Sequence, residues 1–208
     1  MIVVGGLTAC GAGLAAEQSL EESVDVALTA PMSDPGAASC LEFDDSGAAL
    51  AYGEFSDAAI QMGDKIAEIV SLRSAEVAGS AYCSDRQGLV VFIKPGSDEA
   101  EQDLLAVAAL YPDQTLEFQY VPRSADEMDD LVAEVVAVGL PELGLSGIGP
   151  DVTSGGLLVE ARGYGDKADA PADELIAEAE AAVIAIVGSD VPLDTDVSRS
   201  EMVAAYNR

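Results

Sequence analysis

The chain of 208 residues is half hydrophobic, so it is long enough and apolar enough to bury a core in one or two small domains. Its 38 acidic and 9 basic side chains give a formal charge of −29, which repels phosphate groups, so no nucleic acid is expected as a partner. It contains no histidine, which excludes Ser-His-Asp triads, Cys-His pairs and histidine-based zinc sites.

The first ten residues are mostly apolar and end in a cysteine. The run from Leu7 to Cys10, Leu-Thr-Ala-Cys, resembles the lipobox of bacterial lipoprotein signal peptides. The resemblance implies that residues 1–10 are the remnant of a signal segment and that Cys10 carries a lipid anchor. No Lys or Arg precedes Lys65, so the positively charged start of such a signal is expected upstream. The alternative is a short apolar strand with an unrelated cysteine.

Two cysteines remain once Cys10 is set aside. In an exported protein, where disulfides persist, this even number favours a bridge between Cys40 and Cys83. The bridge would clip the N-terminal segment to the first strand and stabilise the fold by roughly 2 to 4 kcal/mol. The alternative is two separate thiols. Neither cysteine belongs to a Cys-x-x-Cys pair, so a thioredoxin-like redox role is not expected.

Residues 11–56 are rich in Ala, Gly, Ser, Pro and acidic residues and carry no positive charge. This composition is typical of an acidic tether followed by a partly ordered lead-in. Within it, residues 41–43 and 49–52 flank the turn sequence Asp-Asp-Ser-Gly at 44–47 and predict a short hairpin.

Residues 57–123 predict a helix-strand-strand-helix-strand unit. Asp57 is expected to cap the first helix, with Ile60 and Ile66 facing the core, and Asp98 is expected to form a capping box with Glu101 at the second helix. The expected elements are a helix over 57–72, strands over 77–83 and 89–93, a helix that starts at 98 and ends at 111–113, and a strand over 115–121.

Residues 124–200 predict the same order again, followed by a C-terminal tail over 201–208. Ser124 and Glu127 form a capping box, and Val136 belongs to the apolar stripe of the helix that they start. The expected elements are this helix, closed at 141–144, strands over 146–152 and 157–161, a helix over 172–187 capped by Asp173 or just before it, and a strand over 191–197.

The two units are in register when the first is moved by 68 positions. Gly79 then falls on Gly147, and the turn residue Gly88 falls on Gly156. The sequence therefore predicts an α+β protein of two tandem αββαβ units, a circular permutation of the ferredoxin-like arrangement. Its helices pack on small antiparallel or mixed sheets, and the strands of the two units either stay apart or continue one larger sheet.

The hairpins with glycine turns and the strand that trails each unit resemble the small α+β lobes in pro-regions of the α-lytic protease class. The run from Gly79 to Tyr82 also resembles a Gly-x-x-Tyr hairpin of uncharacterised secreted bacterial proteins. In the pro-region family the lobe is a folding chaperone for a protease domain. The resemblance therefore implies a chaperone-like or inhibitor-like partner of a secreted protease.

No catalytic residue and no cofactor is predicted, because no nucleotide-binding or nucleophile motif is complete. Acidic clusters are abundant, and at helix N-termini they are expected to stabilise the helix dipole. No metal site is predicted either, and the nearest candidates are Asp194 and Asp196, which alternate outward on the last strand. Four aromatic residues are expected to fill the core of the first unit and not a ligand groove: Tyr82, Phe92, Phe118 and Tyr120.

The function expected from these features is that of a noncatalytic exported protein of the bacterial envelope or periplasm. Anchored through Cys10, it would offer a binding or structural module to a protein partner. One alternative is a chaperone or inhibitor of a secreted protease. Another is a carboxylate-dependent hydrolase, which requires a deep pocket that holds two carboxylates with raised pKa.

Overall fold

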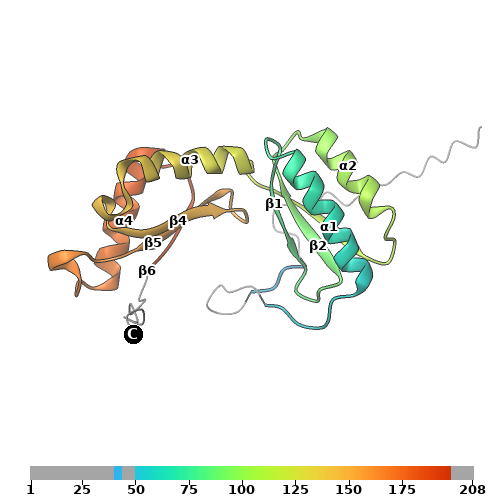
Figure 1. Cartoon of the computed structure of the whole chain (residues 1–208), viewed down its shortest axis with the longest axis horizontal. Helices are drawn as coiled ribbons and strands as arrows, with labels where there is room; N and C mark the ends of the chain where they lie inside the picture. The colour runs from blue at the N-terminus through green and yellow to red at the C-terminus, as the bar shows by residue number, and fades with distance from the viewer. Residues whose placement is uncertain (1–39, 44–49, 198–208) are drawn as a thin grey trace, which may run out of the picture. The chain divides into compact units, whose positions relative to one another are not determined.

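The computed structural model describes residues 40–43 and 50–197. In these residues the order helix-strand-strand-helix-strand occurs twice, and two short 3-10 helices lie in the second unit (Figure 1). The strands form two separate three-stranded sheets and not one larger sheet. The α+β class predicted from the sequence is confirmed.

In the first unit, β2 is the central strand. It pairs antiparallel with β1 and parallel with β3, and α2 provides the crossover that a parallel neighbour needs. The sheet is therefore mixed. The elements of this unit are α1 (Asp57–Leu72), β1 (Val77–Tyr82), β2 (Gly88–Ile93), α2 (Asp98–Ala108) and β3 (Thr115–Tyr120).

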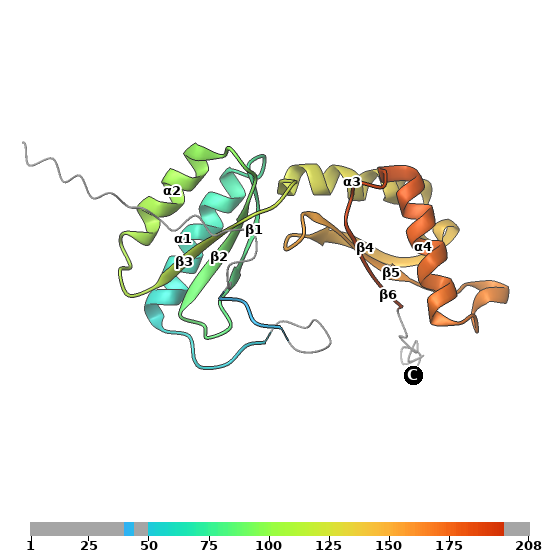
Figure 2. The same cartoon turned by 180° about the vertical axis from the view of Figure 1, so that it is seen from behind.

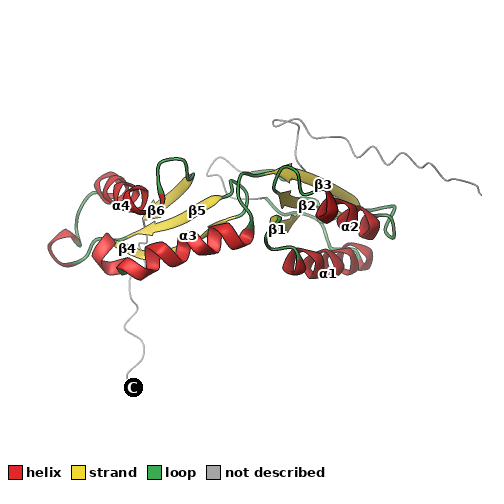
Figure 3. Cartoon of the chain, turned by 90° about the horizontal axis from the view of Figure 1, so that it is seen from above, coloured by secondary structure: helices red, strands yellow, loops and turns green. Residues whose placement is uncertain are grey.

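Both helices of the first unit cover the same face of its sheet. α1 and α2 lie side by side there, on one side of the strands (Figures 1 and 3). Leu89, Val91 and Ile93 point into the core under the helices, where they meet Met62 and Ile66 of α1. Successive residues of a strand point to opposite faces, and since all six residues of β2 are buried, the other face must be covered as well.

A lead-in segment covers that other face, and the predicted Cys40–Cys83 disulfide is present in it. Cys40 and Leu41 pack against the buried Val90 and Phe92 of β2. The Cys40 N–H donates to a carboxylate oxygen of Glu117 at 2.8 Å, and its carbonyl accepts from the Ser84 N–H at 2.9 Å. The turn of the hairpin expected in this segment, at 44–47, lies outside the described residues, but the Leu50 N–H donates to the Glu42 carbonyl, as a hairpin requires.

Two predictions about α1 are wrong. Its cap is Ser56, whose hydroxyl accepts from the Ala59 N–H at 3.0 Å, and Asp57 is the first helical residue. Ile60 is exposed, because the buried side of the helix passes through the preceding residue, Ala59. That stripe consists of Ala59, Met62, Gly63 and Ile66.

The capping box predicted for α2 is also absent. Ser97 occupies the cap position without a side-chain capping bond, and its hydroxyl donates to the Glu76 carbonyl at 3.3 Å. Glu101 accepts instead from the Tyr120 hydroxyl at 3.4 Å. Both side chains thus hold α2 to other parts of the unit and not to its own first turn.

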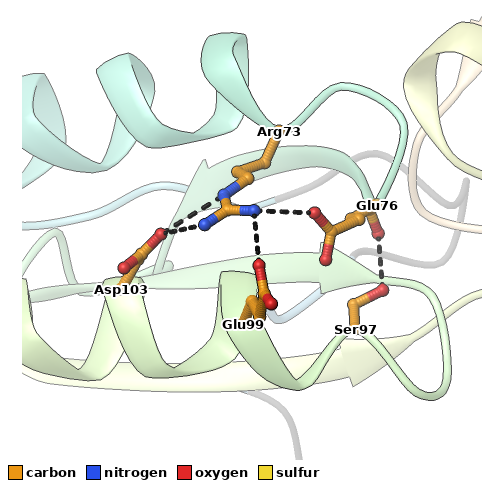
Figure 4. A network of polar contacts seen from close by, with 5 residues as sticks. All are labelled: Arg73, Glu76, Ser97, Glu99 and Asp103. Atoms are coloured by element: carbon orange, nitrogen blue, oxygen red, sulfur yellow. Dashed lines mark hydrogen bonds and ion pairs between the residues drawn. The ribbon is translucent and has the colours of Figure 1, made fainter.

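Arg73 binds the ends of α1 and α2 together (Figure 4). Its guanidinium contacts Asp103 at 2.7 Å and both Glu76 and Glu99 at 3.2 Å. The hydrogen bonds that its guanidinium donates to Asp103 and then to Glu99 raise the pKa of Arg73 above its ordinary value. One basic residue therefore offsets the repulsion among three of the many carboxylates.

The second unit repeats this plan, with β5 central, antiparallel to β4 and parallel to β6 (Figure 2). The range predicted for α4 is confirmed, and of the two predicted cap positions the one before Asp173 is correct: the cap is Pro171, which makes no side-chain capping bond. β6 begins two residues later than predicted. The elements are α3 (Ala125–Val138), η1 (Leu140–Leu143), β4 (Leu145–Asp151), β5 (Gly156–Ala161), η2 (Gly165–Lys167), α4 (Ala172–Val187) and β6 (Leu193–Val197).

The capping box at the start of α3 is confirmed. The Glu127 N–H donates to the Ser124 hydroxyl, and the Ser124 N–H donates to Glu127 at 2.9 Å. Lys94, at the end of β2, adds an ion pair to Glu127 at 2.7 Å. The Lys94 contact and then the Ser124 N–H lower the pKa of Glu127. Val136 is exposed, contrary to the predicted stripe of this helix.

The glycines that recur in register have a steric cause. A Cβ at Gly88 would collide with the carbonyl of Thr115 on β3, and a Cβ at Gly156 would collide with the Pro192 carbonyl just before β6. Each glycine therefore lets the central strand approach its parallel neighbour closely. A register shift also occurs at the same place in both hairpins, before Gly79 and before Gly147.

Replacement of Gly156 by alanine should destabilise the fold by about 1 to 3 kcal/mol, because the added methyl displaces the Pro192 carbonyl. Urea unfolding followed by circular dichroism measures the change. Gly149→Ala is the matched control on β4, since no atom lies within 4 Å of the added Cβ. Equal stability of the two variants would contradict this account.

Replacement of Glu127 by glutamine should destabilise the protein at pH 7 by about 1 kcal/mol, the usual loss for a capping contact. A lowered pKa stabilises the fold above the unfolded value of 4.5, and this contribution is lost as the pH falls below it. The difference in Tm from the natural chain should thus be constant from pH 8 to pH 5 and close in more acidic solution. Glu134→Gln on the same helix, which lacks these contacts, should show no such closure.

Candidate functional site

The second sheet has one covered face and one open face. Leu157, Val159 and Ala161 of β5 are buried against α3 and α4. Leu158 and Glu160 alternate with them and are exposed, Leu158 at 45% of its surface. None of the helices in the described part of the chain covers this second face, since α3 and α4 both pack on the first.

The corresponding face of the first sheet is closed. Val90 and Phe92, 68 positions before Leu158 and Glu160, are buried. Met128 and Val152, together with the lead-in, pack against them. The two units thus share a backbone plan but differ in what lies over the outer sheet face.

Asp194 and Asp196 lie on the open face. Their strand register places Asp194 beside Leu158 and Asp196 beside Glu160. On the other side of β5, Gly149 of β4 pairs with Leu158 and Gly147 pairs with Glu160. We call these six residues the open face: Gly147, Gly149, Leu158, Glu160, Asp194 and Asp196. Within the described ranges no group of three or more acidic, Cys or His side chains is arranged to hold a metal ion, so Asp194 and Asp196 gain no third ligand.

The aromatic residues of the first unit do not share one groove. Phe92 and Phe118 are buried on opposite faces of the sheet. Tyr82 is half-buried over Gly63 of α1. Tyr120, expected in the core, is 39% exposed and bonds to Glu101 on the helix side.

The pKa values of two carboxyl groups are lowered, whereas a carboxyl group that acts as a general acid needs a raised pKa. The pKa of Glu127 is lowered by Lys94 and Ser124. Burial raises the pKa of Asp151, but hydrogen bonds from Ser154 and Thr153 in the β4-β5 turn outweigh burial and lower it. Both groups are held ionised by structural contacts, which gives no support to a carboxylate-dependent hydrolase.

A pocket of about 340 Å³ lies in the second unit, between η1, the end of β5 and α4. One wall is apolar, and charged side chains line the remainder. The lining residues that matter most are Leu143, Leu175, Ala179 and Ala182 among the apolar ones, and Glu142, Arg162, Lys167 and Glu178 among the charged ones.

Arg162 and Tyr164 form the polar side of this pocket. The Tyr164 hydroxyl donates to the Leu145 carbonyl at 2.8 Å, and the Arg162 guanidinium lies 5.6 Å from the centre of the tyrosine ring. The backbone N–H of Arg162 donates to the Gly144 carbonyl at 2.8 Å. Lys167, by contrast, is occupied by Glu178, with contacts of 2.6 and 2.7 Å.

Sequence reasoning missed this pocket. The glycine-rich run from Gly163 to Lys167 lacks the spacing and the final Ser or Thr of a phosphate loop, so the sequence indicates only a loop there. A usable signal was present, since two of only nine basic residues, Arg162 and Lys167, fall within six positions. The rest of the lining includes Leu175, Ala179 and Ala182 of α4, where the sequence predicts only a helix over 172–187.

No protein-family model matches this chain, and no curated protein is similar to it at a significant level. No helix in the described residues is both long enough and apolar enough to cross a membrane. Cys10 and the lipobox-like run lie outside the described residues.

Proposed function

We propose that this protein is a noncatalytic, exported component of the bacterial envelope that binds a partner protein through the open face of its second unit. The observation that carries the proposal is the difference between two equivalent sheet faces. In the first unit the outer face is covered by the chain itself, and in the second it is exposed.

The chemistry of the open face favours a basic partner with some apolar surface. Leu158 lies next to the carboxylates of Glu160, Asp194 and Asp196. No atom lies near the space beside Gly149, which leaves room for a partner backbone to approach β4. Opposite charge would steer such a partner, and desolvation of Leu158 would contribute to affinity.

The proposed location in the envelope is supported by the Cys40–Cys83 disulfide, because such bonds persist in oxidising compartments. The lipobox-like run that ends at Cys10 supplies the proposed anchor. The tether that follows Cys10 would place the folded units away from the membrane surface.

Site-specific photo-crosslinking tests the binding face. With p-benzoylphenylalanine in place of Leu158, irradiation of cells should give a discrete adduct with one partner protein. The same reagent at Leu110 is the matched control, since Leu110 is 65% exposed but lies in the first unit. The double variant Asp194→Asn, Asp196→Asn should weaken the adduct at Leu158 at least several-fold.

Equal adducts from both positions, or none from Leu158, would overturn the proposed face. The chemistry of the captured protein also matters. If the partner is a secreted protease, the chaperone or inhibitor function implied by the pro-region resemblance is favoured over a general envelope module.

Metabolic labelling tests the anchor separately. Cells grown with radioactive palmitate should label the full-length product and not a Cys10→Ala variant, because the thiol carries the lipid. A Cys40→Ala variant should still be labelled, which controls for general cysteine modification. Absence of label from the natural chain would reject the anchor and leave the binding face untouched.

A further inference from the structure

We propose that the pocket between η1, β5 and α4 binds a small organic carboxylate with an apolar body, whose carboxylate pairs with Arg162. This site is distinct from the open face, and the inference does not depend on a protein partner. The proposal combines three observations: an arginine without an ionic partner, an apolar pocket wall beside it, and contacts that hold both in place.

Basic side chains are scarce in this chain, and those in its described part are mostly committed. Arg73, Lys94, Arg123 and Lys167 each form an ion pair with a carboxylate. Arg86 lies over the Phe55 ring and donates to the Gly53 carbonyl, and Lys65 is exposed on α1.

Arg162 differs from all of these. It is half-buried and lines a pocket, yet among the described residues it has neither an ion pair nor a side-chain hydrogen bond. Its guanidinium lies over the face of the Tyr164 ring, 5.6 Å from the ring centre. In a chain with 38 acidic residues, a guanidinium left without a carboxylate is ready to accept one from a ligand in the bidentate manner that arginine favours.

The pocket has the size and lining for a ligand of one ring or a short branched chain. Its volume of about 340 Å³ falls at the small end of the usual range for ligand sites, which starts at about 300 Å³. Leu175, Ala179 and Ala182 of α4 present short apolar side chains to it, and Leu143 of η1 adds another. An apolar body would contact this wall while its carboxylate faces Arg162.

The polar side of the pocket is held in place by the fold. The bond from the Tyr164 hydroxyl to Leu145 fixes the ring on which Arg162 lies. Gly163 allows the following turn to fold back, because a Cβ there would collide with the Lys167 carbonyl. The ion pair from Lys167 to Glu178 then ties this turn to α4. Such a support reduces the entropy that a ligand must overcome on binding.

The remaining charges define the ligand further. Lys167 neutralises Glu178, whereas Glu142 has no recorded partner in the described part of the chain. Glu142 would repel a second negative group, so a monocarboxylate is favoured over a dicarboxylate. Removal of the Glu142 charge should therefore tighten binding, the opposite of the effect of removing Arg162.

Titration of the full chain with phenylacetate, followed by two-dimensional amide NMR, tests the site. The amides of Leu175, Ala179 and Arg162 should shift with saturable binding. Phenylacetamide, which has the same shape without the charge, should bind at least tenfold more weakly. 4-Methylpentanoate should compete with phenylacetate, because it fills the same wall with an aliphatic body.

Variants identify the arginine. Arg162→Gln should weaken phenylacetate binding at least tenfold, Arg162→Lys should weaken it less, and Glu142→Gln should strengthen it two- to threefold. Arg86→Gln is the matched control, since it removes the same charge from another arginine that lies over a ring, 4.9 Å from its centre. The amide spectra also report whether each variant is folded.

Three results would overturn the proposal. They are failure of both acids to shift the pocket amides, equal binding of phenylacetamide, and an equal loss of affinity in Arg86→Gln and Arg162→Gln, which would indicate only a long-range charge effect. None of these outcomes bears on crosslinking at Leu158, so this proposal and the proposed function can fail separately.

Discussion

The central strand β2 has six buried residues, so the first sheet needs cover on two faces, and its own helices supply cover on only one. The second cover comes from outside the αββαβ plan. The lead-in and the start of α3 with Met128 both contribute to it. Because burial of strand side chains is the main source of stability in so small a unit, the first unit depends on segments that precede and follow it.

In the described part of the chain no segment covers the outer face of the second sheet, and the central strand of that sheet has a different pattern. β5 alternates between buried and exposed residues, with Glu160 at the position equivalent to Phe92. An acidic residue in place of an apolar one thus distinguishes the two sheets: the outer face of the first must be covered, whereas that of the second tolerates solvent. The backbone constraint is the same in both units, as the crowded glycines Gly88 and Gly156 at the start of β2 and β5 show.

Much of the fold could be predicted from the sequence because its signals are local. The prediction of a capping box at Ser124 and Glu127 was correct, since both residues lie within one helical turn and their hydrogen bonds to each other are both formed. The box of Asp98 and Glu101 failed because the cap is Ser97, so that Ala100 and not Glu101 stands three residues after it, and Glu101 accepts from the distant Tyr120. Propensity carries no information on such competition.

The candidate sites were harder to predict for the same reason. The open face depends on the phase of burial in β5, and the apolar run of Leu157, Leu158 and Val159 does not reveal which residue faces solvent. The pocket needs side chains from three elements to converge. Cysteine parity, by contrast, needed no geometry, and the Cys40–Cys83 pairing followed from counting and compartment alone.

The disulfide closes a separation of 43 residues, which in the chain-entropy account corresponds to roughly 4 kcal/mol. Until the two thiols are oxidised, the lead-in is held over Val90 and Phe92 only by noncovalent contacts such as those to Glu117 and Ser84. In a reducing compartment the outer face of the first sheet would therefore open more often and present apolar side chains to chaperones. Oxidation of the two thiols would therefore hold the outer face of the first sheet closed.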